Sequence, residues 1–308
     1  MTSRNLLAAL AALLLLLAAC GDVSSGAPPA GRADPARQPA TSSTDGDSEE
    51  ELVAAATVLE KDGGGAMLCL GGVATSLPPQ CGGPVITNWD WTDVADADSR
   101  AGTTWGEYVV VGTYDGTTFT LTREPMTREE YDGPPLATDD EQDLTTPCPE
   151  PSGGWGPVEP GRATDITLET TVGAAHALPG FADLWLDQSP NDADPQRDGE
   201  AAMNDPTRLV LNVRVTEDVA GAERRLRETW GGALCVSRAV RTAAELRSIQ
   251  SELNEQVQGL LWSSFGRDTV DVSVVHDDGS LQQEVDERYG AGVVRVSSVL
   301  RPYRDQRG

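Results

Sequence analysis

The sequence has few of the residues on which common catalytic and binding sites depend. Its 308 residues include only two histidines, and Lys61 is the only lysine among 23 basic residues. Against these stand 49 acidic residues, which give a formal net charge of −26 at pH 7. A chain of this charge repels phosphate backbones and anionic lipid surfaces. The composition therefore argues against nucleic acid as a partner.

The sequence also lacks motifs for nucleophilic, phosphate-binding or metal-dependent chemistry. It contains no Gly-x-Ser-x-Gly or Ser-x-x-Lys motif, and the glycines after Lys61 lack the Gly-Lys-Ser/Thr ending of a phosphate loop. His176 and His276 each lack a second histidine nearby, and no cysteine pair has zinc spacing. We therefore predict no cofactor, no metal site and no catalytic residue, and we expect structural or surface roles for both histidines.

The only long apolar run lies at the N-terminus and ends in a cysteine. Residues 6–19 are all apolar, which is too few for a membrane-spanning helix of roughly 20 residues but suits a secretory signal. The run ends in Leu17-Ala18-Ala19-Cys20, which resembles the lipobox of bacterial lipoproteins. That resemblance implies removal of residues 1–19 as a signal peptide and attachment of a lipid of the palmitate type to Cys20. An ordinary secretory signal with a coincidental Cys20 is the alternative.

A lipid-anchored chain of this kind would lie on the extracytoplasmic face of the cell membrane, where thiols oxidise. Four cysteines remain after Cys20, and four cysteines allow three pairings. We predict one disulfide between Cys69 and Cys81, whose short loop would contribute roughly 3 kcal/mol on the loop-entropy model. The second disulfide is then expected between Cys148 and Cys235.

Composition divides the remaining chain into a tether, a β domain and a connecting segment. Residues 20–51 are rich in Ala, Pro, Ser and acidic side chains, as is typical of a disordered tether. Residues 52–124 predict a small antiparallel barrel or sandwich, with a hairpin of residues 108–114 and 117–123 joined at Asp-Gly. Residues 52–61 alternate only loosely and would also suit a helical turn. Residues 125–163 contain many prolines and carboxylates and form the connecting segment.

Residues 164–308 alternate between helix and strand signals, which predicts an α/β domain with a mixed sheet covered by helices, and an α+β class overall. No internal repeat is apparent in the sequence. One helix is expected to be capped by Thr216 and ended by Gly231, and another to run from Thr242 to Gly266. The other expected helices are 166–178 and 280–289, and the expected strands are 181–188, 209–215, 233–240, 269–276 and 293–300.

Two further patterns are candidate binding sites. Trp89 and Trp91 would lie on one face of a strand and could form a stacking platform for a sugar or peptide, or they could belong to the core. Asp194, Gln196, Asp198 and Gly199 follow the spacing of a calcium loop, but Asp205 stands where that loop has glutamate. Because Pro195 interrupts this pattern, we interpret it as a solvated acidic loop.

Several short phrases carry resemblances to known families. The phrases Leu68–Gly72, Pro78–Pro84, Trp89–Trp91 and Trp230–Cys235 resemble those of membrane-anchored lipoproteins of high-GC Gram-positive, actinobacterial type, which implies a location but no activity. Leu184–Gln188, the strand at Leu209 and the unit that contains Ala244–Ile249 are similar to pro-regions of secreted serine proteases. That second resemblance implies a protease-binding role, although no protease domain follows in this sequence.

The sequence therefore leads to three functional hypotheses. The first is a non-catalytic binding or accessory module that is displayed outside the membrane and contacts another envelope protein or a ligand. The second is a membrane-anchored hydrolase that uses only carboxylates, which would require acidic side chains to converge in a pocket. The third is a protease-binding module.

Overall fold

The computed structural model describes residues 50–136, 143–194 and 196–304. The predicted signal peptide, Cys20 and nearly all of the tether lie outside these residues. The described chain contains both helices and strands in mixed sheets, which confirms the α+β class. Within the same residues, no helix is both long and apolar enough to span a membrane.

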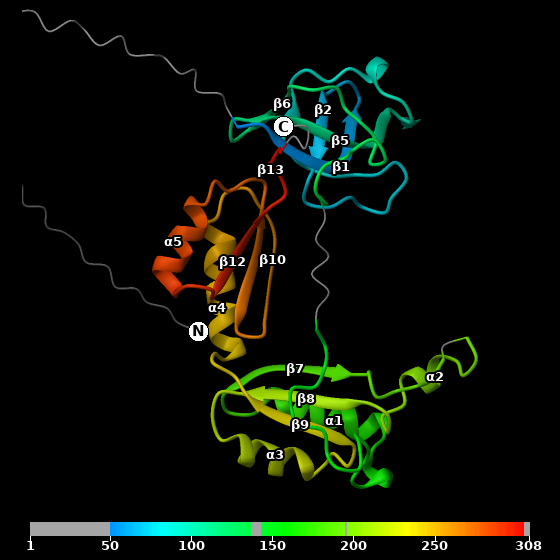
Figure 1. Cartoon of the computed structure of the whole chain (residues 1–308), viewed down its shortest axis with the longest axis vertical. Helices are drawn as coiled ribbons and strands as arrows, with labels where there is room; N and C mark the ends of the chain where they lie inside the picture. The colour runs from blue at the N-terminus through cyan, green and yellow to red at the C-terminus, as the bar shows by residue number, and fades with distance from the viewer. Residues whose placement is uncertain (1–49, 137–142, 195, 305–308) are drawn as a thin grey trace, which may run out of the picture. The chain divides into compact units, whose positions relative to one another are not determined.

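Residues 52–121 form a small β domain whose strands close into a ring (Figure 1). β1 pairs with both β2 and β5, and β3 and β6 complete the ring between β2 and β5. These pairings are antiparallel except for β3 with β6. The strands are β1 (Leu52–Lys61), β2 (Ala66–Cys69), β3 (Val85–Ile86), β4 (Asp98–Arg100), β5 (Thr103–Tyr114) and β6 (Thr118–Leu121), and the C-terminal β13 (Arg301–Pro302) pairs with β1.

β1 is buried on both faces, which explains its loose sequence alternation. Ala56 and Val58 pack with Leu68 and Phe119 in the domain core. On the opposite face, Val53 packs with Val109 and Val111 of β5 and with residues of the connecting segment and β13. A strand that is covered on both faces has no polar side and therefore no clear period of two.

The predicted hairpin is confirmed by β5 and β6. The side chain of Asp115 accepts hydrogen bonds from the backbone N–H groups of Thr117 at 2.8 Å and Thr118 at 2.7 Å. Gly116 adopts a φ of +94°, which a residue with a side chain rarely adopts. These two turn residues direct the chain back along β5.

Apart from the four-residue α2 (Glu200–Met203), residues 165–298 contain the same order of elements twice, helix-strand-strand-helix-strand. In each repeat the first two strands are antiparallel and the second and third are parallel. Figure 1 shows the helices of each repeat on one face of its sheet. The first repeat is α1 (Asp165–His176), β7 (Phe181–Asp187), β8 (Val210–Val215), α3 (Val219–Arg227) and β9 (Ala233–Arg238), and the second is α4 (Ala243–Gln256), β10 (Leu260–Gly266), β11 (Thr269–Val274), α5 (Ser280–Tyr289) and β12 (Val294–Ser298).

Small details of the backbone are shared by the two repeats. α1 and α4 both begin with a capping box, at Thr164 and Thr242. A glycine with positive φ precedes the first strand of each repeat, at +66° for Gly180 and +69° for Gly259. The pairing then shifts its register immediately after Phe181 and after Leu260. The expectation of one mixed sheet is therefore replaced by two three-stranded sheets, each with its own core.

Two expected helices have other boundaries in the structure. The helix from Thr242 ends at Gln256 instead of Gly266, because the backbone becomes extended at Val257 and residues 260–266 pair with β11 after Gly259. The apolar residues Leu260 and Leu261 fit the helical spacing by coincidence. α3 is capped by Asp218, whose side chain accepts from the N–H of Gly221, and not by Thr216; the helix ends at Arg227, before Gly231.

Both predicted disulfides are present. The Cα atoms of Cys69 and Cys81 are 5.6 Å apart, and those of Cys148 and Cys235 are 5.8 Å apart. The second disulfide holds the connecting segment against β9, where Trp155 packs on Cys235 and its neighbours. The remaining short elements are η1 (Trp91–Asp93), η2 (Pro160–Arg162) and α2 (Glu200–Met203).

Candidate binding pocket

A pocket of about 570 Å³ lies against the second repeat, and we call it the α4–α5 pocket. Its walls come from the C-terminal end of α4, the end of β11, the loop that follows β11, and α5. Tyr114 and Gly116 of the β5–β6 hairpin also line it. Pockets of several hundred cubic ångströms accommodate small organic ligands in other proteins.

The floor of the pocket is apolar because two helices turn their buried stripes toward β11. Leu253 of α4, Val274 of β11 and Val285 of α5 are each at most 3% exposed. Val257 and Leu281 lie beside them and are half-buried. These five side chains form an apolar surface on which the body of a ligand can pack.

Three acidic residues line the pocket, Asp277, Asp278 and Glu284, and we call them the acidic rim. The carboxylate of Asp277 accepts the backbone N–H groups of Leu281 at 2.9 Å and Gln282 at 3.3 Å, and so caps the start of α5. Asp278 accepts the N–H of Ser280 at 3.0 Å. Hydrogen bonds from the Ser280 side chain and backbone lower the pKa of Asp278, which keeps this rim carboxylate charged at neutral pH.

At the other end of the pocket, Arg288 and Tyr289 are held by Glu252. The guanidinium of Arg288 pairs with Glu252 and donates to Oε1 of Gln256 at 2.7 Å. The hydroxyl of Tyr289 donates to Oε2 of Glu252 at 2.7 Å. Burial and this hydrogen bond raise the pKa of Tyr289 to about 12, so the phenol keeps its proton. The single guanidinium of the lining is therefore already paired.

His276 lines the pocket with a defined ring orientation. Its Nδ1 lies 3.1 Å from the carbonyl oxygen of Leu300, which can only accept a hydrogen bond. Nδ1 therefore carries the proton in the neutral ring, and Nε2 is left as an acceptor. In contrast, His176 packs against the ring of Phe181, with centroids 4.7 Å apart.

Trp89 and Trp91 do not lie on one strand, because β3 ends at Ile86 and Trp91 begins η1. Their rings meet edge to face with centroids 5.3 Å apart, and Trp89 also contacts Tyr108 at 5.2 Å. Nε1 of Trp91 donates to Glu60 at 2.8 Å. Both rings are half-buried against the core of the β domain, so they face each other and that core instead of forming a flat stacking platform.

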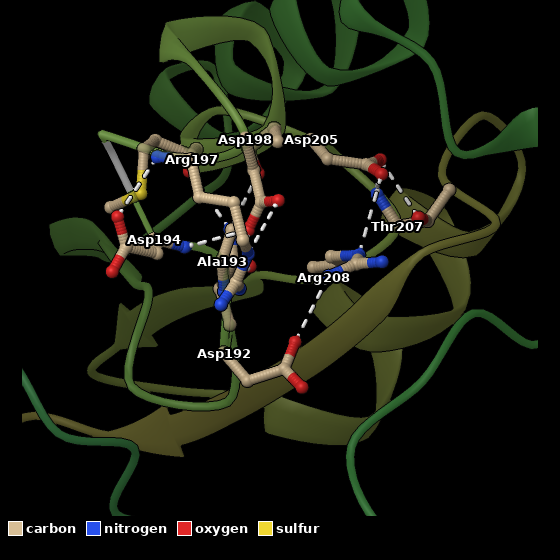
Figure 2. Close-up of polar contacts among 11 residues, drawn as sticks. Asp192, Ala193, Asp194, Arg197, Asp198, Asp205, Thr207 and Arg208 are labelled. Carbon is tan, nitrogen blue, oxygen red and sulfur yellow. Dashed lines mark hydrogen bonds and ion pairs between the residues drawn. The ribbon is translucent and has the colours of Figure 1, made fainter.

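The acidic loop between β7 and β8 is bonded to itself, as Figure 2 shows. Arg208 joins Asp192 at 3.0 Å and Asp205 at 3.7 Å, while Arg197 pairs with Asp198 at 2.7 Å. Asp194 accepts the N–H groups of the two residues that follow Pro195. The carboxylates of this loop thus point to arginines and backbone donors. No group of three potential metal ligands occurs in residues 50–136, 143–194 and 196–304.

The α4–α5 pocket was not predicted from the sequence. In the sequence, the residues of the pocket floor have the pattern of ordinary helix and strand core, and the three rim carboxylates cannot be distinguished among 49 acidic residues. The sequence feature that lies in the pocket is His276 followed by two aspartates.

No protein-family model matches this chain, and the comparisons with curated proteins and with solved structures found no match either.

Proposed function

We propose that this protein is a lipid-anchored, extracytoplasmic binding module of the cell envelope, which holds a ligand in the α4–α5 pocket without transforming it. The observation that carries the proposal is the pocket itself, with its apolar floor and charged rim. A β domain and two αββαβ repeats would be displayed beyond the membrane on the acidic tether. Cys20 is the proposed lipid attachment site.

The two disulfides support an extracytoplasmic location. Disulfides persist mainly outside the cytoplasm, where the glutathione and thioredoxin systems do not reduce them. All four cysteines after Cys20 are paired in the described chain. Cys20, the remaining cysteine, is then the natural site for a lipid.

The carboxylates favour binding over hydrolysis. A hydrolase that relies on two carboxyl groups needs one whose raised pKa lets it hold a proton. Each described carboxyl group with a displaced pKa has it displaced downward, because hydrogen bonds to the charged form outweigh burial. Such groups stay charged at neutral pH and act as hydrogen-bond acceptors.

The proposal is tested by crosslinking in the native envelope. A photoreactive residue is placed at Gln258, on the pocket lining, and in a matched copy at Val158, which is 70% exposed and outside the pocket. We expect one crosslinked species, close to stoichiometric, from position 258 and none from position 158. A full-length copy with Cys20→Ser should be released from the membrane and lose that product. Equal crosslinking from both positions would count against a ligand in the pocket.

A further inference from the structure

The charge and shape of the α4–α5 pocket point to a class of ligand. We propose that it binds an organic cation, in which a primary amine or guanidinium group is carried on an aliphatic or aromatic body. This inference rests on the proposed binding function and extends it by naming the chemistry of the ligand.

The rim selects against anions. Its titratable lining consists of three carboxylates, those of Asp277, Asp278 and Glu284, together with His276, the guanidinium of Arg288 and two tyrosines. That guanidinium is bound to Glu252 and Gln256 and lies 5.2 Å from the centroid of the Tyr289 ring. An incoming anion would meet three negative charges and a guanidinium that already has its partners.

Glu284 distinguishes a cation from a neutral ligand. It projects from the exposed side of α5, and none of the residues described in the structure donates a hydrogen bond to its carboxylate or forms an ion pair with it. A neutral ligand that covered this carboxylate would remove its water without replacing the lost hydrogen bonds. A cationic ligand supplies the missing partner.

The rest of the pocket accommodates the apolar body of such a ligand. Leu253, Val274 and Val285 form a buried floor, and Tyr114 and Tyr289 also line the pocket. The lining therefore combines apolar contact with the attraction of the carboxylates for a cation.

Comparison with the first repeat shows which part of the rim the fold does not require. Asp218 and Asp277 are each the third residue after the preceding strand, and each accepts a backbone N–H of the helix that follows. The connection that precedes α3 is residues 216–218, whereas the one that precedes α5 is residues 275–279. The longer connection adds Asp278, which lines the pocket, and Gly279 with a φ of +98°. Asp278 is thus an addition of the second repeat, whereas Asp277 has a counterpart in Asp218.

The test uses three probes of equal length that differ in charge: n-hexylamine, n-hexanol and hexanoate. Their binding to the full chain in phosphatidylcholine nanodiscs is measured by calorimetry, with empty nanodiscs subtracted. We expect hexylamine to bind about three- to tenfold more tightly than hexanol, and hexanoate not to bind measurably. Added salt should weaken only hexylamine binding.

Two variants test whether the preference for hexylamine over hexanol depends on the carboxylate of Glu284. Glu284→Gln should lower the affinity for hexylamine about three- to tenfold and leave hexanol unchanged. Glu255→Gln is the matched control, since Glu255 is an exposed residue of α4 outside the lining. It should change neither affinity.

The outcomes separate the ligand class from the binding function. Equal affinity for hexylamine and hexanol, or equal effects of the two variants, would overturn the cation proposal and leave the pocket as a binding site. If none of the three probes bound, the cation proposal and the proposed binding function would both be overturned.

Discussion

At the scale of single residues, the surroundings of each carboxylate decide what it does. Asp187 is only 3% exposed and accepts hydrogen bonds from the N–H and hydroxyl of Thr146 and from the N–H of Ser189. Glu284 is exposed and lies on the rim of a pocket. The first carboxylate fastens the connecting segment to β7, whereas the second is available to a ligand.

Asp187 makes the stability of the first repeat depend on pH. Burial raises the pKa of Asp187, but hydrogen bonds from Thr146 and Ser189 outweigh burial and leave the pKa below its ordinary value. Its contribution is therefore complete above the unfolded-state pKa of about 3.9 and is lost as the pH falls through the lower folded-state pKa. We expect Asp187→Asn to cost about 1–3 kcal/mol at pH 7 and much less at about pH 3.

Urea unfolding at the two pH values measures this difference. Asp98→Asn serves as the control, because Asp98 is exposed on β4 and should show no such dependence. A cost of Asp187→Asn that did not change between pH 7 and about pH 3 would show that the charge of Asp187 has no role.

At the scale of elements, the boundary between α4 and β10 lies at residues 257–259. Apolar residues at helical spacing continue from Leu246 through Leu261, so the sequence pattern extends the helix too far. The backbone is already extended at Val257, and Gly259 then takes a left-handed φ, after which residues 260–266 pair with β11 around a turn in which Arg267 and Asp268 both have positive φ. Strand pairing, a nonlocal interaction, overrides helical periodicity there.

Replacing Gly259 by alanine should destabilise the second repeat by about 1–2 kcal/mol. The nearest atom to an added Cβ is 3.7 Å away on Val275, so the expected cost comes from the backbone conformation and not from a clash. Gly173→Ala is the matched substitution: Gly173 lies inside α1 with open space around it, and alanine there should stabilise the helix by about 0.5–1 kcal/mol. Urea unfolding distinguishes the two signs, and equal effects would refute the argument.

At the scale of the whole molecule, the repeated αββαβ unit gives the chain two separate cores. The first core contains Leu211, Leu226 and Trp230, and the second contains Leu246, Val272 and Val294. The first repeat carries a long acidic loop between its first two strands and a disulfide to the connecting segment, whereas the second has a tight turn and the α4–α5 pocket. The first repeat is thus crosslinked to the connecting segment, and the second repeat carries the pocket.

Breaking the Cys148–Cys235 disulfide should therefore loosen the first repeat alone. The loop-entropy model gives about 4–5 kcal/mol for a crosslink of this separation and about 3 kcal/mol for Cys69–Cys81. In a full chain with both Cys148→Ser and Cys235→Ser, hydrogen exchange should accelerate in β8 and β9 and remain unchanged in β11 and β12. The matched double variant at Cys69 and Cys81 should affect β1 and β2 instead. Equal acceleration in both repeats would contradict the independence of their cores.

Local signals in the sequence predicted a large part of this fold. The hairpin at Asp115-Gly116, the capping box at Thr242 and the strand at Leu209 each depend on neighbouring residues, and each is present. Features that depend on distant partners were missed. Trp89 and Trp91 take their orientation from Tyr108 and Glu60, which a strand pattern does not include.

The sequence by itself determined the acidic charge, the α+β class and the short Cys69–Cys81 loop, because composition, local periodicity and loop length depend on residues close along the chain. Cys148 and Cys235, which are 87 residues apart, then remained as the second pair. The lipid anchor at Cys20 remains a prediction from the sequence. Only the tertiary structure decided that residues 165–298 are one unit repeated, since the two copies share backbone geometry rather than side chains. It also decided the pocket, because α4, β11 and α5 bring Leu253, Asp278 and Glu284 together only when the second repeat is packed.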